Sequence, residues 1–188
     1  MIRLFVALLC ASSLAQAAEF RFDASNSELG FTGDYGGEAV PGVFKQFSGK
    51  AVFDLAQPLA TRFDTEIVVA SLDTDYAERD DTLRGPEFFD VEAHPTAHWT
   101  SIGDCTMAAA QLTCPGTLAL KGVTHPVALI VAPSADGRTI EGKASLERDQ
   151  FAIGSGDWAD PTTIAALPDA MAQGREFRRL VADLLLAV

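Results

Sequence analysis

The stretch Phe63-Asp64-Thr65-Glu66-Ile67-Val68-Val69-Ala70-Ser71 decides the fold class. Its odd-numbered positions are apolar or hydroxylated, and two acidic residues fall between them. Such alternation is typical of a β-strand that buries one face and turns the other to water. The stretch therefore predicts a half-buried strand.

The same alternation recurs along the chain, at residues 20–23, 29–31, 51–55, 98–102, 117–120 and 126–131. Turn signals such as Lys121-Gly122 and Asp136-Gly137 separate these runs. Many short strands at this spacing indicate an all-β sandwich or barrel, and the residues alone leave both open. No internal repeat or linker divides the chain.

The strand pattern stops between Asp75 and Gly85, which predicts a short helix at about residues 75–85. Asp75 and Glu78 have the spacing of a capping box, and Gly85-Pro86 ends the helix. Phe88-Phe89 follow in a loop. Two adjacent side chains cannot both point inward from a regular strand. This pair is therefore either a plug of the core or a lid or wall of a pocket.

Charge excludes several classes of protein. The 188 residues include 26 acidic and 14 basic side chains, for a formal net charge of −12. Nucleic-acid backbones and anionic lipid surfaces attract clustered Lys and Arg, which this chain lacks. No apolar run reaches the roughly 18 residues of a membrane-spanning helix. We therefore expect neither a nucleic-acid partner nor an integral membrane protein.

Residues 1–17 have the features of a secretory leader. Arg3 precedes the apolar run Leu4–Leu14, and Ala15-Gln16-Ala17 is a small-x-small cleavage site. A buried N-terminal helix is the alternative. Cleavage after Ala17 would leave residues 18–188 as one exported domain, and we expect it in a bacterial periplasm.

Two cysteines, Cys105 and Cys114, remain after Cys10 leaves with the leader. An even number in an oxidising compartment predicts a disulfide. A hairpin with a two-residue turn at Ala109-Ala110 would place the two cysteines opposite each other. A redox pair or half of a metal site is the alternative, but neither a CxxC motif nor a second Cys/His pair is present.

Four motifs resemble those of the YceI-like family, and they occur along the chain in the same order as in that family. They are DTDYAERDDTLRGPEFFDV at 73–91 with HPTA at 94–97, GVFKQFSGKAVFD at 42–54, GTLALKGVT at 116–124, and RDQFAIG at 148–154. The last has Ala152 where glycine is usual in the family. The resemblance covers about residues 20–160.

The resemblance implies an all-β, lipocalin-like barrel of eight antiparallel strands, with the short helix in a connection. It also implies a secreted or periplasmic protein that binds a polyisoprenoid or a similar amphiphile, such as a quinone, in the barrel. No catalytic residue and no required cofactor come with it. Some relatives are homodimers, and some are associated with membrane cytochromes of the b561 type.

The aromatic composition agrees with an apolar interior. The chain has 12 Phe but only 2 Tyr and 2 Trp, and phenylalanine has no hydroxyl that needs a hydrogen-bond partner. A small barrel holds one small ligand. A filled core would use the same residues. The inward positions predicted to contact the lipid are Phe22, Phe31, Phe44, Phe47, Phe53, Ile67, Val69, Leu83, Phe88, Phe89, Trp99, Leu118, Leu120, Val127, Leu129 and Phe151.

Polar residues favour a binding protein over an enzyme. His94 and His98 would lie about 13 Å apart along a strand, too far to share a metal ion, and we predict no metal site. Gly154-Ser155-Gly156 lacks the leading glycine of a nucleophile elbow. The alternative functions are a stress-related interaction protein with a filled core and an enzyme of isoprenoid or lipid metabolism.

The C-terminal residues 177–188 fit two structures. Helical spacing is found at Phe177, Leu180, Val181, Leu184, Leu185 and Val188, whereas an alternating strand would close the barrel. An unclosed barrel would expose a strand edge, so we favour the strand.

Overall fold

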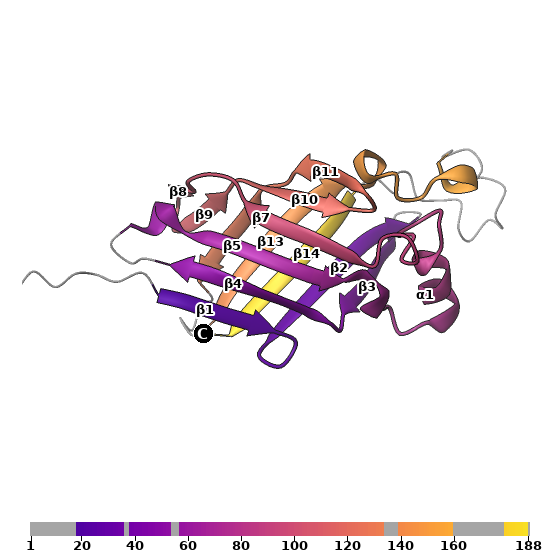
Figure 1. Ribbon diagram of the computed structural model, residues 1–188, viewed down its shortest axis with the longest axis horizontal. Coiled ribbons are helices and arrows are strands. Elements are labelled where there is room, and N and C mark those ends of the chain that lie inside the picture. Colours follow the sequence, from indigo (N-terminus) through magenta and orange to yellow (C-terminus); the bar gives the residue numbers. More distant parts are fainter. Residues whose placement is uncertain (1–17, 36–37, 54–56, 134–138, 160–178, 188) are drawn as a thin grey trace, which may run out of the picture.

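The protein is described here by a computed structural model that covers residues 18–35, 38–53, 57–133, 139–159 and 179–187 (Figure 1). These residues form antiparallel strands, four short 3-10 turns and the α-helix α1 (Ala77–Arg84). The predicted leader, residues 1–17, lies outside them. In the described part of the chain, no helix is long and apolar enough to cross a membrane.

The strands form two sheets in which every pairing is antiparallel. The six-stranded sheet has the order β1 (Ala18–Asp23), β4 (Phe47–Phe53), β5 (Arg62–Val68), β7 (Thr96–Ser101), β10 (Gly116–Leu120) and β11 (Val123–Pro126). The eight-stranded sheet has the order β6 (Leu72–Asp73), β3 (Glu38–Phe44), β2 (Ser27–Tyr35), β14 (Arg179–Ala187), β13 (Thr139–Glu147), β12 (Leu129–Pro133), β9 (Gln111–Cys114) and β8 (Thr106–Ala108). Figure 1 views the first sheet in front of the second, with the core between them.

The predicted all-β antiparallel fold with one short helix is confirmed, but a single closed barrel of eight strands is not found. No hydrogen-bonded ladder joins the two sheets among the described residues. The chain passes between the sheets where strands are interrupted, for example at the 3-10 turn η2 (Val69–Ser71) between β5 and β6. The predicted strand 126–131 is likewise divided between β11 and β12.

The stretch 63–71 forms most of β5 and then η2. Phe63 and Thr65 are buried, while Asp64 and Glu66 point away from the core as the alternation predicts. The strand ends at Val68, and Val69 is almost wholly buried in the turn. The alternation therefore placed the buried side chains well, although the strand is shorter than the pattern.

The C-terminal segment is a strand, as favoured. β14 lies between β2 and β13, with Leu184 opposite Leu29 of β2 and Gly142 of β13. The helical alternative for residues 179–187 is wrong, because the two neighbouring strands would otherwise leave long edges unpaired.

The predicted disulfide hairpin is also found. β8 and β9 pair with Ala108 opposite Gln111, and Ala109 and Ala110 form the turn with φ of 49° and 65°. Two consecutive left-handed residues are the signature of a tight type I′ hairpin turn. Cys105 and Cys114 are bonded, with Cα atoms 4.1 Å apart, and both are buried.

Helix α1 lies at the opposite end of the molecule and begins two residues later than predicted. No side chain caps its N-terminus at Tyr76, so the predicted capping box is wrong. Asp75 instead has a left-handed φ of 59°, and its amide donates to the carboxylate of Asp73 at 2.8 Å.

The helix is attached to the sheets by its polar side chains. Buried Asp80 accepts bonds from the amide and hydroxyl of Thr74, at 2.9 and 2.6 Å. Arg84 donates to the carbonyls of Ala70 and Leu72, at 3.1 and 2.7 Å. These bonds fix the start of the connection that follows the helix.

The turn predicted at Lys121-Gly122 joins β10 to β11, and both residues have positive φ. The turn predicted at Asp136-Gly137 lies outside the described residues.

Candidate functional site

An apolar cavity of about 90 Å³ lies between the two sheets. Its described lining comes from β2, β3, β5, β7, β10, β12 and β13, from the turn η2, from the β11–β12 connection and from the loop after α1. The lining residues are Leu29, Phe31, Phe44, Thr65, Ile67, Val69, Phe89, Ala97, Trp99, Leu118, Leu120, Val127, Leu129, Ala144 and Leu146.

The cavity wall has almost no polar group that needs a hydrogen-bond partner. Thr65 supplies the one hydroxyl among the described lining residues. The indole N–H of Trp99 donates to the carbonyl of Val127 at 3.0 Å. Such a wall suits a hydrocarbon, because a hydrocarbon offers no partner to an unpaired polar atom.

Ten of the residues predicted to contact a lipid lie together in this wall. They come from both sheets and from the loop after α1: Phe31, Phe44, Ile67, Val69, Phe89, Trp99, Leu118, Leu120, Val127 and Leu129. The structure thus brings together positions as far apart in the sequence as β2 and β12. Their contact with a lipid stays a prediction.

The other six predicted residues do not line the described cavity. Phe22 belongs to the edge strand β1, where its ring lies over Gly49. Phe47 is a buried core residue, and Phe53 and Leu83 are half-buried against the core. Phe88 packs on Trp158, and Phe151 packs on His125. Inward parity identifies buried residues, but it does not tell which of them reach a cavity.

Five lining residues were missed by the sequence analysis: Leu29, Thr65, Ala97, Ala144 and Leu146. A signal was present for the first three. Each lies two residues before a predicted residue on the same strand, so strand parity alone places it on the same face. Thr65 and Ala97 carry small or hydroxylated side chains, which a pattern of large apolar residues does not include.

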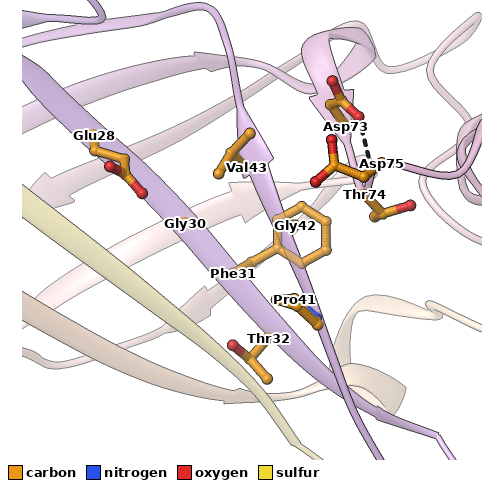
Figure 2. A pocket seen from close by; sticks show the side chains of 10 residues that line it. All are labelled: Glu28, Gly30, Phe31, Thr32, Pro41, Gly42, Val43, Asp73, Thr74 and Asp75. Carbon is orange, nitrogen blue, oxygen red and sulfur yellow. Dashed lines mark hydrogen bonds between the residues drawn. The ribbon is translucent and has the colours of Figure 1, made fainter.

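A second hollow, of about 400 Å³, lies against β2, β3 and the turn 73–75 (Figure 2). Figure 2 shows the ring of Phe31 at Gly42, where an added Cβ would lie 2.4 Å from the ring. The wall carries the carboxylates of Glu28, Asp73 and Asp75. Charged groups stay solvated here, so this hollow does not suit a hydrocarbon chain. The smaller cavity is the better candidate for an apolar ligand.

One carboxylate of this hollow has a cationic partner. Lys45 donates to Asp73, and this bond raises the pKa of Lys45 and lowers the pKa of Asp73. Both groups therefore stay charged at neutral pH.

The loop after α1 closes one end of the cavity. Phe89 lines the cavity and meets the ring of Phe44 edge-on, with centroids 6.4 Å apart. Phe88 turns the other way and meets the ring of Trp158, with centroids 5.2 Å apart. The two adjacent phenylalanines thus have different neighbours, and only Phe89 contributes to the cavity wall.

Two cations support the segment that faces this loop. Arg148 donates to the carbonyls of Ile153 and Gly154, at 2.7 and 3.0 Å. Lys121 donates to the carbonyl of Ala152 at 2.7 Å. Burial lowers the pKa of both side chains. Their bonds to carbonyls compensate part of the cost of removing the charges from water.

The histidines do not form a metal site with their neighbours. His98 lies 3.3 Å from Asp64, and the ring of His94 lies beside Gly122. Within the described ranges, no group of three or more His, Cys, Asp or Glu side chains is placed to hold a metal ion.

Comparison with known proteins identifies the family. The YceI-like domain model matches residues 20–170. A UPF0312 protein of Photorhabdus laumondii is 35% identical over 135 residues, which is 70% of this chain and 70% of that protein. The YceI protein of Salmonella agona is 35% identical over 134 residues, 66% of each chain.

Solved structures share the fold. BcnA of Burkholderia cenocepacia matches with a TM-score of 0.72 and 24% identity, over 88% of this chain and 99% of that one. A polyisoprenoid binding domain from Saccharophagus degradans, implicated in plant cell wall breakdown, matches with a TM-score of 0.57 and 17% identity. That match covers 92% of this chain and all of the domain. The extent of the family match and the identity to its relatives show that this chain belongs to the YceI-like family.

Proposed function

We propose that the protein binds the hydrocarbon chain of a polyisoprenoid, or of a similar amphiphile such as a quinone, between its two sheets. The observation that carries the proposal is the wall of the cavity, which is apolar apart from the hydroxyl of Thr65. A structural neighbour that is itself a polyisoprenoid binding domain supports the class of ligand. The role would be transport, storage or sensing of the lipid.

Burial of an isoprenoid would supply ample free energy. Each isoprene unit has about five carbons, and each buried methylene contributes roughly 0.8 kcal/mol. Burying a few units therefore gives micromolar or tighter binding after the cost of association.

The cavity must widen to hold such a chain. An apolar cavity of about 150 Å³ holds one benzene molecule, and this cavity measures about 90 Å³. It therefore admits no more than about one isoprene unit before side chains move. The loop that carries Phe89 lies outside the paired strands that supply most of the wall, and we expect it to move.

The same wall argues against catalysis. The described lining residues include no titratable side chain, whereas acid–base chemistry needs such groups within hydrogen-bond reach of the substrate. We therefore propose a binding protein that needs no cofactor besides its lipid ligand.

We also propose that the protein acts in the periplasm after removal of residues 1–17. The Cys105–Cys114 disulfide supports an oxidising compartment. The homodimer and the b561-type cytochrome partner stay predictions that rest on the family resemblance.

An interaction protein with a filled core is the second candidate, and the small volume of the cavity favours it. In that case the two sheets would bind no lipid, and the acidic outer surface would carry the function.

Tryptophan fluorescence distinguishes the two candidates. Trp99 lines the cavity, while the second tryptophan, Trp158, does not. In a Trp158→Phe variant, we expect ubiquinone-2 to quench the Trp99 emission saturably at one molecule per chain. Ubiquinone-0, which has the same ring and no isoprenoid tail, is the control and should not reach saturation. Equal quenching by both quinones, or no saturable quenching, would contradict binding in the cavity.

A further inference from the structure

The two ends of the molecule are closed by different kinds of bond. At one end, the β8–β9 hairpin is held by the disulfide, and the amide of Cys105 donates to the carbonyl of Leu59 at 2.7 Å. At the other end, the loop after α1 contacts the segment around residues 148–158, drawn in orange in Figure 1, through hydrogen bonds and a ring contact. The second end is therefore the one that opens more readily.

Two preformed loops meet at this end. The lid loop, residues 85–91, folds back on α1, because the amides of Phe89 and Val91 donate to the carbonyls of Leu83 and Arg84 at 3.0 and 3.1 Å. The latch loop, residues 148–158, is held in shape by Arg148, which also donates to the carbonyl of Trp158 at 3.2 Å. Each loop keeps its own hydrogen bonds when the two separate.

The hydrogen bonds between the loops are centred on one carbonyl. The carbonyl of Glu87 accepts from the amides of Gly154 and Ser155, both at 2.8 Å, and from the Ser155 hydroxyl at 3.2 Å. Phe88 adds its edge contact with Trp158. Phe89 belongs to the lid loop and forms part of the cavity wall, so movement of this loop away from the latch loop uncovers the cavity.

We propose that the contact between Glu87 and residues 154–155 is a latch, and that the lipid enters and leaves between the lid loop and the latch loop. This inference rests on the proposed function, since it concerns how the ligand reaches the cavity. The hydrogen-bonded contact then sets the rate of ligand exchange, although it does not touch the ligand.

Weakening the latch tests the inference. Ser155 has a φ of −83°, close to the value of about −65° that proline imposes. Ser155→Pro therefore removes one of the two amide donors to Glu87, and residue 155 itself can nearly keep its φ. Ser155→Ala keeps the amide and removes only the hydroxyl, so it is the matched control. With a fluorescent farnesyl anthranilate as probe, we expect release into excess farnesol to be about fivefold faster or more in the proline variant, and faster by a smaller factor in the alanine variant, which loses only the 3.2 Å hydroxyl bond.

Locking the latch is the second test. A Glu87→Cys/Ser155→Cys variant, loaded with farnesyl anthranilate and then joined by a short bismaleimide, should release the probe at least about tenfold more slowly than before the reaction. The same reagent on a Thr106→Cys/Thr113→Cys variant joins two opposite positions of the far hairpin and should leave the release rate unchanged.

The outcomes separate the two proposals. Slower release from the lid crosslink alone supports the latch. Unchanged release from the lid crosslink, or slower release from the hairpin crosslink alone, overturns the latch and leaves the proposed function standing. Failure of the wild-type protein to bind farnesyl anthranilate or ubiquinone-2 overturns the proposed function itself.

Discussion

Replacing Ala144 with phenylalanine is expected to lower the affinity for ubiquinone-2 by at least about tenfold. Ala144 lies on β13 opposite Leu129 of β12, and its side chain lines the cavity. A benzyl group there occupies the space that the first isoprene unit would fill. The lost burial of one unit, at roughly 0.8 kcal/mol per methylene, exceeds the 1.4 kcal/mol of a tenfold change. Titration of the intrinsic fluorescence with ubiquinone-2 measures the effect.

Ala119→Phe is the matched control, because Ala119 lies on β10 between the cavity residues Leu118 and Leu120 and faces the other side of the sheet. It should bind ubiquinone-2 like the wild type. Overpacking at residue 144 costs about 1–3 kcal/mol of stability, so circular dichroism must show a folded variant. If it unfolds, Ala97→Leu fills the cavity from the opposite sheet with a smaller group. A folded cavity-filled variant with wild-type affinity would show that the ligand binds elsewhere.

Replacing Asp80 with alanine is expected to lower the free energy of unfolding by about 3 kcal/mol. The Asp80 carboxylate accepts two bonds from Thr74, and its side chain is only 9% exposed. Arg79 donates to the same Thr74 hydroxyl at 2.8 Å, and Arg84 lies 4.0 Å from the second carboxylate oxygen. Removing the carboxylate leaves the buried amide and hydroxyl of Thr74 without their acceptor, and Arg84 loses one of its two carboxylate neighbours. Thermal unfolding should show a melting temperature lower by about 6–12 °C.

Asp81→Ala is the control for charge and helix propensity. The Asp81 side chain is 81% exposed and pairs with Arg84 at 3.2 Å on the surface. An exposed pair of this kind contributes less than about 1 kcal/mol, so the melting temperature should change little. Equal losses in the two variants would mean that the buried network does not hold α1 to the sheets.

Local patterns in the sequence predict the strands and the hairpin well, because they depend on neighbouring residues. The alternation around Phe63 and Thr65 depends only on burial of one face of the strand. The turn at Ala109-Ala110 depends only on pairing of the two strands beside it. The division into two sheets depends on where the chain bends, as at Val69–Ser71. Packing of strands that are distant in the sequence sets the position of this bend, so no local sequence pattern predicts it.

The lid was predictable only in part, for the same reason. The pair Phe88-Phe89 showed that something other than a strand follows α1. Which of the two faces the cavity depends on the position of Trp158, about 70 residues later. The capping box failed because Asp75 has a left-handed backbone and lies one residue before the cap position, and the carboxylate of Glu78 accepts from the Tyr76 hydroxyl instead.

Ala152 shows how a departure from the family pattern can be understood. The motif that residues 148–154 resemble leads one to expect glycine at this position, and Ala152 has a left-handed backbone with φ of 52°. Glycine adopts this conformation without a Cβ penalty. The carbonyl of Ala152 accepts the bond from Lys121, so the turn is kept despite the substitution.

Native mass spectrometry of the purified protein, combined with organic extraction, tests the central claim most directly. We predict one long-chain isoprenoid or quinone per chain in the wild-type protein and its absence from the Ala144→Phe variant. Repeated absence of any lipid from the wild-type protein, together with failure to take up added ubiquinone, would contradict the claim that the space between the sheets is a lipid site.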